Sequence, residues 1–305
     1  MKILILGAGG VGGYFGAHLI RVGADVTFLV RAKRKALIDA KGLCVETPRG
    51  NFAVPAKTVT AEALTPDYDL IVLAPKSYDL DDAIQSLENG LGQAVILPFL
   101  NGLDHLDVLD ARFGRQRVMG GVAHIAATLT DEGAIRQLTD MHSLTVGARH
   151  EAHEKLARAF MELCGQAPFD SVLADDIEQV LWDKWVFLAA LAGMTTLCRG
   201  SVGEIMATPY GKRITEEMYR ECGDVAGAFG HPVAQAARDK ALGMLTAEGS
   251  PFTASMLRDL LSGQRTEHEH ILGAMARRGE AQGLGMPLMR MAHTHMAVQA
   301  QKARA

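Results

Sequence analysis

The sequence predicts an α/β protein, with an N-terminal doubly wound parallel sheet and a C-terminal all-helical region. In the first half of the chain, short apolar runs alternate with helical segments, as in parallel sheets whose strands are joined by crossover helices. Beyond Ala174 the apolar residues recur at helical spacing almost throughout. We therefore expect two domains, residues 1–172 and residues 173–305.

The first thirty residues are the clearest of the strand–helix repeats. Ile3–Leu6 is a continuous apolar run, typical of a strand buried on both faces. The segment Tyr14–Val22 has helical spacing, and Asp25–Val30 reads as a second buried strand. This βα-β order is typical of a Rossmann-type nucleotide-binding domain.

A glycine-rich loop, Gly7-Ala8-Gly9-Gly10-Val11-Gly12, joins the first strand to the helix. In a G-x-G-x-x-G loop at this place, Gly7 permits the tight turn, Gly9 lets the backbone approach a pyrophosphate, and Gly12 lets the helix pack on the strand. The phosphates then meet the positive end of the helix dipole. We predict that this loop, with Gly10 and Val11, binds a dinucleotide; a glycine turn without a ligand is the alternative.

The residue after the second strand favours NADPH over NADH. An Asp or Glu there usually binds the ribose 2′-hydroxyl, whereas an Arg accommodates a 2′-phosphate. This chain has Arg31, with Lys33 and Arg34 as candidate helpers. A solvated basic helix start is the alternative, but it does not explain the missing acid. We predict NADP as the cofactor and Arg31 as the specificity contact.

Further strands and helices are expected up to residue 173. Parallel strands are predicted at Asp69–Ala74 and Ala94–Leu97, followed at their carboxyl ends by Lys76 and by the loop that contains Asn101. Open α/β sheets bind ligands at this edge. Glycine-broken strands at 122–129, 135–138 and 143–146 are expected to form the far edge of the same sheet. Short strands are also predicted at 43–46 and 52–56, and helices at 32–40, 77–88 and 151–163, the last followed by a short segment at about 169–173.

The composition excludes several classes of protein. A net charge of −4 and the absence of a basic stripe argue against a nucleic-acid partner. We find no apolar segment long enough to span a bilayer and no signal peptide, and we expect a cytoplasmic protein. The four cysteines lack CxxC spacing, so we expect reduced thiols and neither a disulfide nor a structural metal.

One lysine in the helical half lies on an apolar helix face. The predicted helix Asp175–Thr196 repeats apolar residues every three or four positions, and Lys184 falls on that face. The aliphatic stem of Lys184 either carries the ammonium to the surface, or the ammonium is buried away from water. Desolvation would lower its pKa into the range useful for proton transfer.

A second candidate is Glu267. Thr266 resembles a helix cap, and Ile271 and Met275 follow Glu267 at four-residue spacing, so Glu267 would begin the inward face of the helix. The alternative is a first-turn carboxylate favoured by the helix dipole.

Taken together, these residues resemble the ketopantoate reductases, which convert 2-dehydropantoate to pantoate with NADPH on the route to coenzyme A. The resemblance covers nearly the whole chain. It implies that Lys184 is the general acid, that Glu267 assists it, and that Asn101 lies near the nicotinamide and the catalytic lysine. It further implies that Arg31 and Lys76 contact the cofactor and that Ser255 contacts the substrate.

The chain departs from this family at the substrate side. Ketopantoate enzymes typically carry asparagines one and two helical turns after the lysine and another shortly before the serine. Leu188, Ala192 and Phe252 stand at these positions here. A site built to pair a buried hydroxyl group loses affinity for it strongly when the partner is replaced by an apolar group. We therefore expect a more apolar 2-oxo acid or a related carbonyl compound as the substrate.

Two histidine pairs do not predict a metal site. The segments His268-Glu269-His270 and His293-Thr294-His295 each place two histidines at i,i+2, which face different sides of a helix. We expect no metal.

Two other functions remain open. One is a dehydrogenase of the 3-hydroxyacid type, which leaves the match from Ser255 to Glu267 unexplained. The other is a non-catalytic NADPH-binding redox sensor, which does not need Lys184 on an apolar face. The sequence also leaves the oligomeric state open, a homodimer included.

Overall fold

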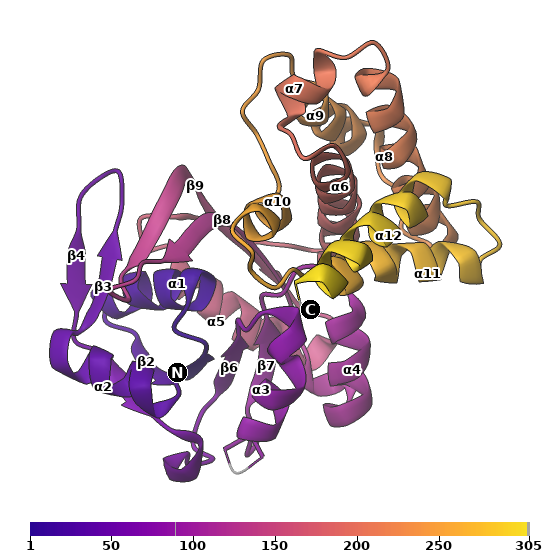
Figure 1. The fold of residues 1–305 in the computed structure, drawn as a ribbon. Coiled ribbons are helices and arrows are strands. Elements are labelled where there is room, and N and C mark those ends of the chain that lie inside the picture. Colours follow the sequence, from indigo (N-terminus) through magenta and orange to yellow (C-terminus); the bar gives the residue numbers. More distant parts are fainter. Residues whose placement is uncertain (89, 304–305) are drawn as a thin grey trace. The chain divides into compact units, whose positions relative to one another are not determined.

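The computed structural model describes residues 1–88 and 90–303, which form two compact units (Figure 1). The first unit comprises residues 1–100 and 105–177, and the second comprises residues 101–104 and 178–305. The segment 101–104 therefore belongs to the helical unit, although it follows a strand of the first unit in the chain. Nothing in its sequence signals this placement.

The first unit contains the predicted parallel sheet, which confirms the fold class. Its strand order is β5-β2-β1-β6-β7, and every pair in it is parallel. The five strands are β1 (Lys2–Leu6), β2 (Asp25–Leu29), β5 (Lys57–Val59), β6 (Leu70–Leu73) and β7 (Val95–Pro98). Because β1 lies in the centre with its crossovers on either side, the order reverses there and creates the ligand-binding edge of this fold.

A second sheet replaces the far edge that the sequence predicted for residues 122–146. Its path is β10-β9-β3-β4, with β8 paired antiparallel to β9. The expectation of a single sheet was wrong, because apolar alternation identifies a strand but not the strand beside it. Its members are β3 (Leu43–Glu46), β4 (Phe52–Val54), β8 (Gly120–Leu129), β9 (Ile135–Gly147) and β10 (Asp170–Leu173).

Helix α1 (Gly10–Arg21) packs between the two sheets. A Cβ atom at Gly16 would lie 2.5 Å from Cζ of Phe28 in the first sheet, and one at Gly10 would lie 2.8 Å from the carbonyl oxygen of Ala127 in the second. Glycines on both faces thus let the helix approach both sheets. The other α-helices of this part of the chain are α2 (Ala32–Lys41), α3 (Leu80–Ser86), α4 (Asp104–Phe113) and α5 (Glu154–Cys164). The sequence analysis did not predict α4.

The second unit is helical, as predicted, and α6 (Ile177–Cys198) is its most apolar helix. By length and composition alone, α6 could cross a membrane, which corrects the expectation that no segment is long enough. However, 67% of its most apolar window is buried inside the protein, as in the core helix of a soluble protein. The remaining helices are α7 (Val202–Met206), α8 (Gly211–Ala228), α9 (Gln235–Leu245), α10 (Ser255–Leu261), a π-helix at Glu269–Gly273, α11 (Ala274–Ala281) and α12 (Pro287–Lys302).

A buried carboxylate holds the start of α12. Glu221 of α8 is 4% exposed and accepts hydrogen bonds from the backbone N–H groups of Leu288 (3.1 Å) and Met289 (3.0 Å). These are donors that a helix leaves unsatisfied at its N-terminus. The same carboxylate also faces the positive end of the α12 dipole. Glu221 therefore ties α12 to α8.

Candidate functional site

The glycine-rich loop has the conformation that a nucleotide-binding turn requires. Gly7 has a φ of +104°, which side chains rarely permit. A Cβ atom at Gly12 would collide with the carbonyl oxygen of Gly7 and lie 3.0 Å from Cγ2 of Ile5. The turn and the close packing of α1 on β1 thus both depend on the absence of side chains.

The N-terminus of α1 can receive an anion. Gly9 is its N-cap, no side chain caps the helix there, and its first turn contains no acidic residue. A Cβ atom at Gly9 would have no protein atom within 4 Å, so the backbone adjoins open space. Backbone N–H groups and the positive end of the helix dipole therefore suit a phosphate at this place.

Of the three basic side chains after β2, Arg34 has a structural role that the sequence analysis missed. Its guanidinium donates to the carbonyl oxygens of Ala8 (2.8 Å) and Gly133 (2.6 Å), which fastens the glycine-rich loop to the turn before β9. By contrast, the side chain of Arg31 is 83% exposed, and its guanidinium lies 4.0 Å from the carboxylate of Asp82. Lys33 is also exposed. In this conformation Arg31 and Lys33 have the greater freedom to meet a phosphate.

Lys76 is exposed and directly precedes the short 3-10 helix Ser77–Asp79 after β6. It lies at the carboxyl edge of the parallel sheet, as the sequence predicts. A cation here has the right charge for the phosphates of a dinucleotide.

The helical unit contains a desolvated lysine. Lys184 lies in α6 beside buried Trp185 and is itself partly buried. Burial lowers the pKa of Lys184 to about 8, while the carboxylate of Glu267 opposes the shift. A group with a pKa near the working pH can both give and take a proton, which is the property of a general acid.

Glu267 is 8% exposed and lies one residue before the helical segment that contains the π-helix. It therefore faces the interior, as the sequence predicts. Thr266 is not the helix cap that the sequence suggested: His268 is the N-cap of the π-helix, and Thr266 Oγ1 lies 2.9 Å from Nδ1 of His268. The π-helix was not predicted. π-Helical segments are rare overall, and those that occur are often found at functional sites.

The loop 101–104 packs against this same segment. Gly102 has a φ of +77°, and a Cβ atom there would lie 2.8 Å from the carbonyl oxygen of His270. Burial lowers the pKa of His270, whereas the Asp104 and Glu267 carboxylates and a backbone hydrogen bond with Asn101 oppose the shift. The structure thus brings Asn101 into the unit that holds Lys184 and Glu267.

Two further residues that the sequence analysis did not identify support this arrangement. Arg278 donates to Asp104, and its guanidinium lies over the Trp185 ring, 5.0 Å from the ring centroid. Trp185 Nε1 in turn donates to the carbonyl oxygen of Ile271 (3.1 Å). These contacts connect α6, the π-helix and the 101–104 loop. No sequence motif marks Arg278, because its role depends on contacts distant in the chain.

The residues predicted for the substrate side differ in exposure. Leu188 is partly exposed and Ala192 is 3% exposed, both on α6. The Phe252 ring stacks near Phe187, with 6.3 Å between ring centroids and 22° between ring planes. Ser255 is exposed at the first position of α10. Leu188, Ala192 and Phe252 are thus apolar, and the ring of Phe252 adjoins a second aromatic ring.

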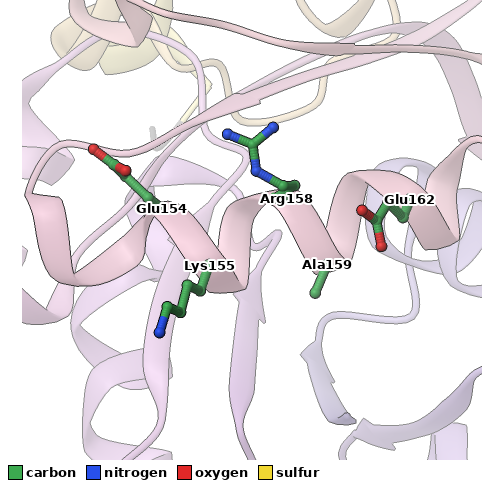
Figure 2. A pocket seen from close by; sticks show the side chains of 5 residues that line it. All are labelled: Glu154, Lys155, Arg158, Ala159 and Glu162. Carbon is green, nitrogen blue, oxygen red and sulfur yellow. The ribbon is translucent and has the colours of Figure 1, made fainter.

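Figure 2 shows a shallow depression along α5 whose lining is mostly charged. Its residues are Glu154, Lys155, Arg158, Ala159 and Glu162, all from one helix. None of the predicted site residues lies in it, and it carries two acidic and two basic side chains. This depression is therefore not part of the candidate site.

Comparisons with known proteins cover both halves of the chain. The family model described as "Ketopantoate reductase PanE/ApbA" matches residues 3–151, and its C-terminal counterpart matches residues 176–300. The uncharacterized oxidoreductase YkpB of Bacillus subtilis is 32% identical over 97% of this chain and 98% of its own length. A 2-dehydropantoate 2-reductase of Archaeoglobus fulgidus is 29% identical over 93% of this chain and 92% of its own length.

A solved structure has the same fold at lower identity. The ternary structure of D-mandelate dehydrogenase with NADH and anilino(oxo)acetate has a TM-score of 0.89, with 19% identity and complete coverage of both chains. At this identity the likeness concerns the fold alone.

Two alanine substitutions separate packing from ligand binding in the glycine-rich loop. Gly12→Ala should lower the free energy of unfolding by about 1–3 kcal/mol, because overpacking forces the helix away from β1. Gly9→Ala should leave stability nearly unchanged, since its Cβ enters open space, but should weaken binding of a nicotinamide dinucleotide. Chemical denaturation and fluorescence titration measure the two effects. Equal stability loss in both variants, or unaltered nucleotide affinity of Gly9→Ala, would contradict this account.

Proposed function

The chain belongs to the ketopantoate reductase family, and on that basis we propose that it reduces a 2-oxo acid to the 2-hydroxy acid with NADPH. Its matched relatives are named as oxidoreductases. The observation that carries the proposal is the desolvated ammonium of Lys184, whose pKa is lowered to about 8 beside the buried carboxylate of Glu267. A purely structural lysine on α6 has no need of this environment.

In the proposed reaction, NADPH supplies the hydride to the carbonyl carbon. Lys184 holds a proton on Nζ and gives it to the carbonyl oxygen, so the product is a secondary alcohol. Glu267 keeps part of the Lys184 population protonated, because its negative charge opposes the effect of desolvation. Asn101, held near His270 by its loop, is proposed to orient the nicotinamide and the substrate carbonyl.

The cofactor proposal rests on two features of the first unit. The uncapped N-terminus of α1 beside open space at Gly9 suits the pyrophosphate, together with Gly7, Gly10, Val11 and Gly12. Exposed Arg31 suits the 2′-phosphate that distinguishes NADPH from NADH. Lys76 is proposed as a further phosphate contact.

The substrate proposal is a 2-oxo acid with an apolar side chain, in place of the hydroxylated substrate that would put the enzyme on the route to coenzyme A. Leu188 lies one turn beyond Lys184, and Phe252 packs near Phe187, so neither of these side chains offers a partner for a hydroxyl group. Ser255 is proposed to bind the carboxylate of the substrate. Assays of a panel of 2-oxo acids with NADPH, followed by loss of nicotinamide absorbance, test the proposal directly.

We propose a cytoplasmic location and a homodimer, with no nucleic-acid or membrane partner. Cys44, Cys164, Cys198 and Cys222 are free thiols, as is usual in a reducing compartment. Light scattering of the purified protein measures the assembly.

Replacing the lysine tests proton donation. Lys184→Ala should keep the fold and cofactor binding while lowering kcat by roughly 10²-fold or more. In the unmodified enzyme, kcat for reduction should fall as the pH rises through about 8, because the ammonium then loses the proton that it must donate. Steady-state rates from pH 6 to pH 10 measure both effects. A folded Lys184→Ala variant with near-normal turnover would make Lys184 a structural residue.

Replacing Arg31 tests the choice of cofactor. Arg31→Ala should weaken NADPH by about tenfold or more and leave NADH nearly unchanged, because a charged hydrogen bond contributes about 1.5–3 kcal/mol and NADH lacks its acceptor. Lys41→Ala, at the opposite end of α2, is the matched control for loss of an exposed charge. Titrations of both variants with both cofactors measure the difference. The assignment is wrong if Arg31→Ala weakens NADPH and NADH equally.

Restoring asparagines tests the substrate side. Leu188→Asn, alone and with Ala192→Asn, should raise kcat/KM for ketopantoate relative to a 2-oxo acid without the hydroxyl group. One recovered hydrogen bond contributes about 0.5–1.5 kcal/mol, so the change should be several-fold. The single variant comes first, because Ala192 is buried and an amide there costs stability. If the unmodified protein already prefers ketopantoate strongly, the apolar-substrate proposal fails while the reductase proposal stands.

A further inference from the structure

Three side chains that could bind a metal ion converge beside the π-helix. His268 and Glu269 come from the segment after Glu267, and His293 comes from α12. One ligand atom from each of the three lies within 4.8 Å of the others. His293 Nε2 is 2.8 Å from Glu269 Oε1, and His268 Nε2 is 3.7 Å from the same oxygen. The cluster takes one histidine from each i,i+2 pair, a combination that the sequence analysis did not consider.

The contact with Thr266 suits His268 for metal binding. Thr266 Oγ1 lies 2.9 Å from His268 Nδ1. When Nδ1–H donates to this hydroxyl, the lone pair of the neutral ring is on Nε2, the nitrogen nearer to Glu269 and His293. A hydrogen bond from the other ring nitrogen is what normally fixes the tautomer and orientation of a metal-binding histidine.

Glu269 is oriented in a similar way. Its Oε2 accepts from NH1 of Arg277 at 3.2 Å, and its Oε1 is the oxygen that faces both imidazoles. The carboxylate thus has one oxygen for the guanidinium and one for the cluster. Arg277 also lies 3.5 Å from Asp104, so its positive charge is shared between two carboxylates.

We propose that His268, Glu269 and His293 form a binding site for a divalent transition-metal ion of the Zn²⁺ class. Two imidazoles and one carboxylate are a common zinc ligand set, with a fourth position left for water. Tetrahedral zinc bonds of about 2.0–2.2 Å place ligand atoms about 3.3 Å apart. The present separations reach this value with small side-chain rotations. Hard cations such as Mg²⁺ prefer oxygen ligands and should bind poorly.

The position of the site gives the ion a structural effect. His268 follows Glu267 directly in the chain, whereas His293 belongs to α12, whose start is held by Glu221. A bound ion would join α12 to the segment that carries Glu267. Metal binding should therefore stabilise the helical unit.

Zinc titration of the tag-free, chelator-treated protein tests the proposal. Isothermal calorimetry should give one Zn²⁺ per chain, and Zn²⁺ should raise the melting temperature. His293→Ala and Glu269→Gln should each weaken Zn²⁺ by at least about tenfold, and Thr266→Val by about tenfold, because loss of a supporting hydrogen bond typically costs that much. His295→Ala, on the same helix, is the matched control and should retain the affinity.

Melting with and without Zn²⁺ gives each variant its own reference, so altered stability does not obscure the result. A Zn²⁺-dependent rise in the unmodified protein and in His295→Ala, but not in His293→Ala, supports the site. Absence of saturable Zn²⁺ binding overturns the proposal. It is also overturned if His295→Ala and His293→Ala lose Zn²⁺ affinity equally, or if the unmodified protein binds Mg²⁺ as tightly as Zn²⁺. These readouts do not depend on any enzymatic activity.

Discussion

The close packing of α1 between two sheets is the constraint on which the first unit depends. Gly10, Gly12, Gly13 and Gly16 face β-strands or the glycine-rich loop at distances that no Cβ atom could occupy. Each glycine destabilises a helix by about 0.5–1 kcal/mol relative to alanine, but these glycines allow α1 to approach both sheets. The result is a fixed helix N-terminus with open space in front of it. The proposed dinucleotide site thus depends on the same residues as the core.

In the second unit, the main constraint is the electrostatic environment of the Lys184 ammonium. Taking the ammonium of Lys184 out of water is unfavourable, and the buried carboxylate of Glu267 offsets part of the effect. The 101–104 loop adds to this arrangement by packing against His270. A short piece of chain that follows a β-strand thereby becomes part of the helical unit. The loop that carries Asn101 thus belongs to the same unit as Lys184 and Glu267.

Local patterns predicted most of the elements and much of the candidate site. The strands near Ile3, Val26 and Ile71 are apolar runs, and Lys184 is detectable because it interrupts an apolar helix face. Membership of the second sheet was mispredicted, because pairing partners leave no mark on a single strand. The π-helix, the Arg34 contacts and the Arg278–Asp104 contact were missed, since each depends on residues distant in the chain. The sequence therefore predicts which residues carry reactive groups better than it predicts the contacts that position those residues.

The π-helix at Glu269–Gly273 also accommodates one extra residue in the chain. A π-turn contains one residue more than an α-turn, yet each makes about one revolution around the helix axis. Loss of a single residue here would therefore restore ordinary helical spacing and leave Glu267 near its present angular position relative to α11. In α11 itself, by contrast, loss of a residue would rotate the segments on either side by about 100° relative to each other. Single-residue deletions should therefore be tolerated better within the π-helix than within α11, because the angular phase that keeps the Glu267 carboxylate near Lys184 is preserved.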